Sequence, residues 1–362
     1  MDTACEIIDL MITEPVRSPI EPSTAGPDFW KRYHDLRRIR QAESRPNDPV
    51  RPDAIEENRL RYRDPFRVEH RYEITSGDRM LSWFDGQTVS PGSAEYESNK
   101  HLFWADAYVR PDHRRAGLAA SWLPILLELV DRHGCTTIGM SAEEESGHAF
   151  LRWLGAEAKL VGAENRLKLA DVDWKMLKEW TAAGAAHSPE TKLEVYDGPL
   201  PEAMWADYGP QLATMLNTMP FEDLDMGEIV VDVEHMREFY TRLQVMSEQV
   251  YTVLTREPDG TISAVTEALW APHRETIVRQ MFTGVRPQAR GRGLGKWVKA
   301  EMLLHLHRRH PEAQWVSTDN AGSNAPMLAI NKRLGFKQFR AGADYQIGRD
   351  DLAARVSQLN RT

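Results

Sequence analysis

The pattern of hydrophobic and polar residues in the second half of the chain predicts alternating strands and helices, typical of the α/β class. Apolar runs bounded by turn residues, such as the Pro-Asp-Gly segment at 258–260, indicate strands. Leu294, Trp297 and Val298 share one face at helical spacing, which indicates a helix. The predicted strands cover 249–257, 261–270, 275–285 and 314–319, and the predicted helices cover 294–310 and 325–336.

The first half of the chain repeats this order of elements. The glycine-containing stretches "VRPDHRRAGLAAS" at 109–121 and "VRPQARGRGLGKW" at 285–297 begin 176 residues apart. The Leu-Gly pairs at 154–155 and 334–335 lie 180 residues apart. Two matched landmarks at nearly the same offset indicate a duplication. The repeat elements predicted for the first half are strands at 101–109 and 135–142 and helices at 118–134 and 147–157. The duplication predicts a domain at 1–172, a linker at 173–192 and a second domain at 193–362.

The stretch at 285–297 has the features of an anion-binding turn. A strand that turns through glycines into a helix presents several unpaired backbone N–H groups at one point, and the helix dipole adds positive charge there. Gly291, Gly293 and Gly295 let an anion approach the backbone, and Arg290 and Arg292 add charge. The spacing is neither that of the NTPase phosphate loop nor that of the dinucleotide fingerprint.

These residues resemble a known family. Arg290-x-x-Gly293-x-Gly295 resembles the Arg/Gln-x-x-Gly-x-Gly/Ala signature of the GNAT superfamily of N-acetyltransferases. Residues 324–336 are similar to the downstream Asn…Leu-Gly-Phe motif of that family, and residues 114–119 fit the first signature again. The resemblance implies two tandem GNAT-like domains, similar in architecture to mycothiol synthase, each with a mixed, mostly antiparallel central sheet flanked by helices.

The resemblance also implies acetyl-CoA as co-substrate, with its pyrophosphate on the glycine loop and its pantetheine arm along the preceding strand. It implies no metal. On this basis the expected coenzyme-binding residues are Thr283, Val285, Arg290, Gly291, Arg292, Gly293, Leu294, Gly295, Lys296 and Asn324.

The two loops differ in a way that favours the second half as the catalyst. The first loop has a single glycine, and Arg115 stands where Gly291 stands in the second. The glutamates at 143–145 follow the first loop and would repel a coenzyme that carries several phosphate charges. We therefore expect the N-terminal domain to be a degenerate structural partner or weakened binder, and the C-terminal domain to be catalytic.

The general acid is the point where this sequence departs from the family. The resemblance implies direct attack of an amine on the thioester in a ternary complex, with a backbone N–H stabilising the oxyanion. Asn331 occupies the position at which many GNAT enzymes carry Tyr, and an amide cannot supply a proton. Ser317, Thr318, Ser323 or water remain as proton donors, or the thiolate leaves unprotonated, because a thiol has a pKa near ~8.5.

Glu267 and Asn324 are the predicted catalytic residues. Glu267 lies on a predicted central strand, where burial would raise its pKa to a value suited to a general base. The alternative for Glu267 is a solvent-facing carboxylate or one paired with an arginine. Asn324 is expected to hydrogen-bond the coenzyme arm.

Composition limits the partners. The formal charge of −9 argues against nucleic acid and favours cationic small molecules. Cys5 and Cys135 cannot build a disulfide framework, which indicates a reducing cytoplasm. The N-terminus has acids where a signal peptide has basic residues, and the apolar runs are too short to cross a membrane. We expect a cytoplasmic monomer or homodimer.

The acceptor is expected to be a small amine. Residues 221–234 precede the first predicted strand of the second half and carry six acids without a basic residue. In a GNAT fold this segment would wall the acceptor site and favour a cationic metabolite or antibiotic, although a solvated acidic loop has the same composition. Two alternatives stay open: a non-catalytic acyl-CoA-binding or regulatory protein, and a transferase that uses another acyl or aminoacyl donor.

Overall fold

The computed structural model describes residues 15–359 and 361, so Cys5 and the N-terminal acids lie outside the described residues. The first half contains β1 (Val16–Pro19), α1 (Pro27–Ser44), α2 (Asp53–Arg61), β2 (Arg67–Ser76), β3 (Arg79–Val89), α3 (Tyr96–Asn99), β4 (Leu102–Val109), α4 (Leu123–His133), β5 (Thr137–Ala142), α5 (Glu145–Leu154), β6 (Glu157–Lys168) and α6 (Trp174–His187). The second half contains β7 (Lys192–Asp197), α7 (Glu202–Leu216), α8 (Val233–Val245), β8 (Gln249–Arg256), β9 (Ile262–Trp270), β10 (Ile277–Val285), α9 (Leu294–Arg309), β11 (Trp315–Ala321), α10 (Ala325–Leu334), β12 (Lys337–Gly348) and α11 (Arg349–Leu359).

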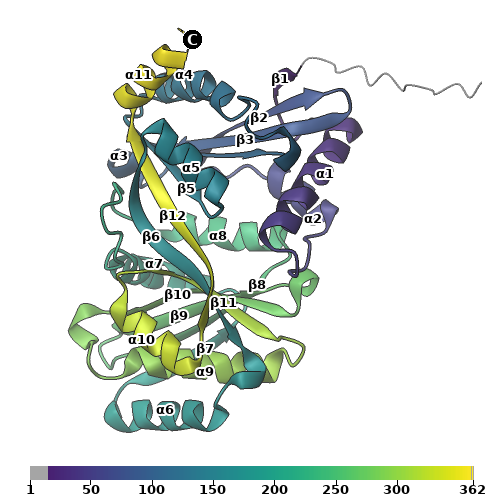
Figure 1. Ribbon diagram of the computed structural model, residues 1–362. Helices are drawn as coiled ribbons and strands as arrows, with labels where there is room; N and C mark the ends of the chain where they lie inside the picture. Colours follow the sequence, from purple (N-terminus) through teal and green to yellow (C-terminus); the bar gives the residue numbers. More distant parts are fainter. Residues whose placement is uncertain (1–14, 360, 362) are drawn as a thin grey trace, which may run out of the picture.

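The described strands form one mixed sheet in which the two halves exchange strands. The order is β1-β2-β3-β4-β5-β12-β6-β11-β10-β9-β8-β7. β6 of the first half pairs with β11 of the second, and β12 of the second half pairs with β5 of the first. Figure 1 shows β6 and β12 side by side, running between the two ends of the molecule. Each half therefore completes its sheet with the last strand of the other.

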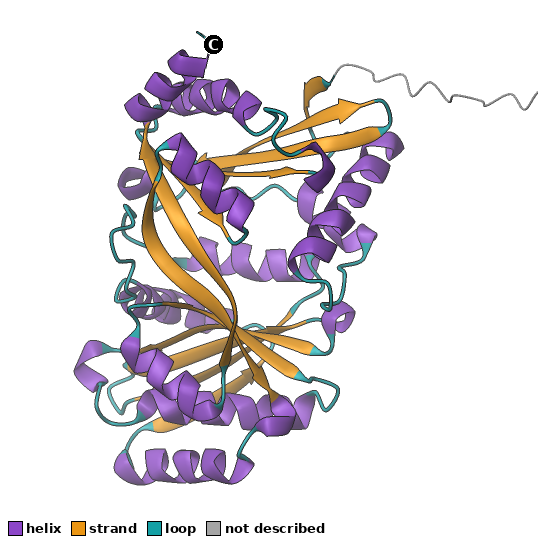
Figure 2. Ribbon diagram, viewed as in Figure 1, coloured by secondary structure: helices purple, strands orange, loops and turns teal. Residues whose placement is uncertain are grey.

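The sheet of the second half is covered on both faces (Figure 2). Along β9, Ala264 and Ala268 face the core formed with α9, whereas Val265 and Leu269 face the core formed with α7 and α8. This alternation follows from the two-residue repeat of a strand. It explains why the segment is apolar at nearly every position.

Most of the predicted elements are confirmed. β8, β9, β10, β11, α9 and α10 lie where the pattern of the second half predicted them, and Gly335 ends α10 with φ 98°. The predicted helix at 118–134 starts later than expected. A 3₁₀ turn at Ala120–Trp122 comes first, and α4 begins at Leu123. Pro124 explains this start, because a residue without an N–H fits the first turn of a helix.

The predicted linker at 173–192 contains helix α6, which packs along α9. A Cβ added to Gly184 would lie 2.5 Å from Cγ of Trp297, and Leu177 is buried in the same core. The linker segment therefore adds a third helical layer beneath the second half.

None of the helices in residues 15–359 is long and apolar enough to span a membrane, α6 included.

Candidate coenzyme loop and acceptor cavity

The loop between β10 and α9 adopts a backbone that its glycines allow. After a short 3₁₀ turn, Pro287–Ala289, Gly291 and Gly293 have φ values of 83° and 81°. A side chain is strained in this left-handed region. At both positions no atom lies within 4 Å of the place that a Cβ would take. The backbone is therefore open to a ligand that comes close.

The loop leads directly into the N-terminus of α9. The amides of Lys296 and Trp297 both donate to the carbonyl oxygen of Gly293, at 3.1 Å. The amides of Leu294 and Gly295 belong to the first turn, whose N–H groups have no acceptor within a helix. Together with the positive end of the helix dipole, these groups form a site suited to phosphate.

The two loop arginines have different environments. Nε of Arg290 donates to the Val285 carbonyl oxygen at 3.4 Å, so this exposed side chain braces the loop it belongs to. Nη1 of Arg292 lies 2.9 Å from Oε1 of Glu257, and its Nη2 donates to Oγ1 of Thr191 at 2.7 Å, so residues outside the loop hold this guanidinium. Lys296 is exposed, with Nζ 5.5 Å from the centre of the Trp180 ring on α6. Arg290, whose Nη2 also donates to Oγ1 of Thr218 at 3.1 Å, and Lys296 are therefore the two of these three cations without a carboxylate partner.

β10 and β11 separate soon after their pairing begins. They pair in parallel from Ile277 opposite Trp315 to Arg279 opposite Ser317. The pairing of β10 with β9 then shifts register between Gln280 and Thr283, which bends β10 away from β11. The remaining backbone of both strands, which includes the expected pantetheine positions Thr283 and Val285, forms two open edges. An extended ligand with amide groups can pair with such edges.

A buried lysine lies beneath this opening. Lys299 on α9 is 1% exposed, and its Nζ donates to Oε1 of Gln280 at 2.7 Å. Nε2 of Gln280 donates to Oγ1 of Thr266 at 3.0 Å, and that hydroxyl lies 2.8 Å from Oγ1 of Thr283. Burial lowers the pKa of Lys299 to about 7. The sequence analysis missed this residue, because the same helix also carries Lys296, Glu301 and His305, so that one more lysine gives no sign of burial.

A cavity of about 720 Å³ lies between the two halves, beside the point where β10 and β11 separate. Arg279, Ser317 and Asp319 line it. Their neighbours Val278 and Val316 face the α9 core, so the cavity lies on the opposite face of the sheet from α9. A ligand in this cavity and a ligand on the glycine loop would meet at the gap between the strands.

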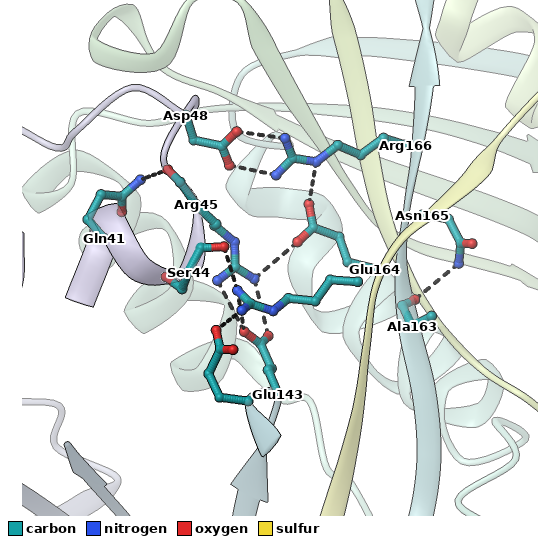
Figure 3. A network of polar contacts seen from close by, with 11 residues as sticks. Gln41, Ser44, Arg45, Asp48, Glu143, Ala163, Glu164, Asn165 and Arg166 are labelled. Carbon is teal, nitrogen blue, oxygen red and sulfur yellow. Dashed lines mark hydrogen bonds and ion pairs between the residues drawn. The ribbon is translucent and has the colours of Figure 1, made fainter. Parts of the chain in front are cut away.

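Figure 3 shows a network of ion pairs in the wall of this cavity. Arg45, after α1, lies 3.1 Å from Glu143 at the end of β5 and 3.0 Å from Glu164 on β6. Arg166 on β6 pairs with Asp48 at 2.5 Å and with Glu164 at 2.7 Å. The network joins the segment after α1 and the end of β5 to β6, the strand that pairs with the second half. Glu143, expected to repel a coenzyme, is paired with arginine instead.

Glu267 is buried beside the gap and is bound to a tyrosine. Its side chain faces the α7 and α8 core, and the Tyr208 hydroxyl donates to its Oε1 at 2.9 Å. Burial raises the pKa of Glu267, and the Tyr208 hydrogen bond opposes that shift. The structure therefore favours the buried alternative for this residue. Glu267 does not itself line the cavity, so a water would have to connect it to an amine.

Asn324, expected to hydrogen-bond the coenzyme arm, is the N-cap of α10, and Asn331, at the usual tyrosine position, lies within that helix. Asn324 lines the cavity, and its Oδ1 caps α10 by accepting from the Met327 amide at 3.4 Å. Asn331 is 2% exposed, and its Nδ2 donates to Oδ1 of Asn320 at 2.8 Å. Oδ1 of Asn331 has no hydrogen-bond partner within the described part of the chain. A buried amide oxygen of this kind is suited to accept an N–H group from a ligand.

The first-half loop has the same bend and different chemistry. Nε of Arg114 donates to the Val109 carbonyl oxygen at 3.1 Å, which matches the contact of Arg290. Arg115, however, takes the left-handed conformation of Gly291, with φ 66°. Arg114 also forms a bidentate pair with Glu43, at 2.6 Å for both contacts. The first loop thus carries a side chain where the second has Gly291, and its Arg114 is held by an acid.

The acidic segment at 221–234 lies against the first half. Oδ1 of Asp225 is 3.0 Å from Nε2 of His101, and the Thr137 hydroxyl donates to Oδ2 at 3.0 Å. Phe221 lines the cavity, but none of the six acids does so in the described lining. Asp225 therefore joins the two halves, whereas Asp232 caps α8 and Glu234 pairs with Arg237 of the same helix. These contacts give the expected cationic acceptor no support.

Comparison with known proteins defines the fold. No protein-family model matches the sequence, and no curated protein matches it significantly. A tandem GNAT protein from the clavulanic acid biosynthesis pathway matches with a TM-score of 0.72 and 20% identity, over 93% of this chain and 99% of its own. A GCN5-related N-acetyltransferase from Sphaerobacter thermophilus matches with a TM-score of 0.62 and 12% identity, over 92% of this chain and 96% of its own.

A third match is the N-myristoyltransferase of Saccharomyces cerevisiae with bound myristoyl-CoA. Its TM-score is 0.53 and its identity 10%, over 93% of this chain and 80% of its own. The chain therefore has the mixed α/β fold of tandem GNAT proteins, which confirms the predicted architecture. At these identities the likeness defines the fold, so the activity has to be argued from the site itself.

Proposed function

We propose that the protein is an acetyl-CoA-dependent N-acetyltransferase that acts on the primary amine of a small molecule. The observation that carries this proposal is the position of the gap between β10 and β11. The glycine loop lies at one end of β10, and the cavity of about 720 Å³ opens on the face away from α9. Donor and acceptor can thus approach the gap from different sides, as direct transfer in a ternary complex requires.

The residues around the gap fit the coenzyme. The amides of Leu294 and Gly295, with the cation of Arg290, suit its pyrophosphate. The open edge of β10 suits the amides of the pantetheine arm, and the unpartnered Oδ1 of Asn331 adds an acceptor for one N–H. These four features surround one path from the loop to the gap.

In the proposed mechanism the amine nitrogen attacks the thioester carbonyl carbon, and the C–S bond breaks. Glu267 accepts the amine proton through a water, because its raised pKa makes it a suitable base. A backbone N–H of β10 stabilises the oxyanion. The departing thiolate takes a proton from solvent, since a thiol has a pKa near ~8.5.

Calorimetric titration with acetyl-CoA tests the coenzyme site, with Gly293→Glu as the disrupting variant. Gly117→Glu is a matched control in the other half, because Gly117 and Gly293 have φ values of 82° and 81° and equally open surroundings. We expect one site per chain that Gly293→Glu abolishes and Gly117→Glu retains. The reverse pattern would assign the coenzyme to the first half, and absence of binding to the wild type would refute the proposal.

A second candidate is a non-catalytic acyl-CoA-binding protein. Asn331 favours it, because this residue replaces the tyrosine that serves as the acid in many GNAT enzymes. Thiol release from acetyl-CoA across a panel of amines separates the two functions. Binding without thiol release from any amine would favour the second candidate.

A further inference from the structure

The charges in the wall of the cavity indicate what kind of acceptor fits. Six arginines and six acidic residues line it, so the wall has no formal net charge. Such a wall does not select a polycation or a polyanion. It suits a ligand that carries both signs of charge.

Most of these charged side chains already have partners. Arg45, Arg166 and Arg340 are paired with acids of the same wall. Arg274 pairs with Glu248, Arg51 with Glu56, and Asp344 accepts from the Ser141 hydroxyl. Among the residues described, Arg279 and Asp319 are the two charged members of the wall whose side chains make neither an ion pair nor a hydrogen bond.

These two free charges flank the reactive gap. Arg279 is the last β10 residue opposite β11, where it faces Ser317. Asp319 lies two residues further along β11 and therefore on the same face as Ser317. Strand rise and spacing place the two backbones on the order of 8 Å apart. An amino and a carboxylate group of one small molecule can reach both side chains over such a span.

We infer that the acceptor is a small amine that also carries a carboxylate, of the amino-acid class. Arg279 binds its carboxylate and Asp319 binds its ammonium group beside the gap. A guanidinium matches a carboxylate through two parallel hydrogen bonds, which fixes the orientation of the ligand. Asp319 then holds the nitrogen at the point where β11 leaves β10. This acceptor class rests on the proposed function and differs from the cationic one that the acidic segment suggested.

The test uses pairs of ligands that differ in the carboxylate alone. Amino acids, β-alanine and 4-aminobutyrate are compared with their carboxamides in calorimetric titrations of the protein saturated with free CoA. We expect at least one acid to bind ~100-fold more tightly than its carboxamide. Equal or tighter binding of the carboxamides, or no binding by either class, would overturn the inference.

Variants separate recognition from folding. Arg279→Gln should weaken binding of the acid 10- to 100-fold, leave its carboxamide unchanged and leave the Kd of acetyl-CoA within twofold. Arg279→Glu should change the binding preference from amino acids to diamines. Misfolding cannot produce such a gain of diamine binding. Arg308→Gln, an exposed arginine near the end of α9, is the control. If acetyl-CoA does not bind, but Arg279→Gln still weakens binding of the amino acid, the proposed function fails and the acceptor site stands.

Discussion

Lys299→Met is the perturbation that most directly tests the electrostatics beneath the gap. Lys299 is 1% exposed in the core of the second half, and Gln280 is its hydrogen-bond partner. Burial without a carboxylate partner lowers its pKa from 10.5 to about 7. Between these two pH values the unfolded chain binds more protons than the native protein, so stability rises with pH across this window.

The size of the effect follows from the two pKa values. At pH 7 the unfavourable burial of the protonated lysine opposes folding by about 4 kcal/mol, and at pH 10 by about 1 kcal/mol, at 1.36 kcal/mol per pH unit. Methionine removes the cost of burying the lysine. It also leaves Oε1 of Gln280 without its donor, which costs about 2 kcal/mol at every pH. Lys299→Met should therefore stabilise the protein by about 2 kcal/mol at pH 7 and destabilise it by about 1 kcal/mol at pH 10.

Thermal unfolding followed by circular dichroism at pH 7 and pH 10 measures this reversal. With an unfolding entropy of ~2.1 cal/mol/K per residue over 362 residues, the change of about 3 kcal/mol corresponds to roughly 4 °C in the difference between the Tm values of variant and wild type. Lys296→Met is the matched control on the same helix, because Lys296 is exposed. A Tm difference for Lys299→Met that stays constant between the two pH values would refute the reasoning.

Three further predictions follow from the same contacts. Tyr208→Phe removes the hydrogen bond that lowers the pKa of Glu267, so the acidic limb of the pH–rate profile of acetyl transfer should move to higher pH, and Glu267→Gln should remove that limb. Arg166→Met should lower the free energy of unfolding in urea by about 3 kcal/mol, because the largely buried Asp48 loses its ion-pair partner and Glu164 keeps only Arg45. Residues 1–172 and 193–362, produced together with a tag on one of them, should copurify, because the exchanged strands lie between the halves; two independent monomers would contradict this.

The local elements of the fold could be predicted from the sequence, but the exchange of strands could not. The glycine loops and Leu-Gly pairs located the duplication, and the apolar runs located β8 to β11. β6 and β12, however, are both half-buried strands that follow a Leu-Gly pair. Their local pattern is the same whether they pair within their own half or across it. The partner is decided by tertiary packing, which places Leu167 in the core of one half and Ile347 in the core of the other.

The glycine loop and the helix that follows it could be predicted because the residues that shape them lie in one short stretch. The cavity could not, because its wall combines Arg45, Arg166, Arg279 and Arg340, which lie far apart in the sequence. The segment at 221–234 misled the sequence analysis for a related reason. Its composition showed the sign of the charge, and only the contacts show that Asp225 binds the first half and that Asp232 caps α8.

The strand exchange gives the first half a role that does not depend on its own loop. The cavity wall takes Asp48 and Glu143 from the first half, and Arg166 from β6, whose backbone pairs with β11 of the second. Removal of the first half would remove one side of the acceptor cavity and leave β11 with an unpaired edge. The first half therefore contributes to the proposed acceptor cavity, although Arg115 stands in its loop where the second loop has Gly291.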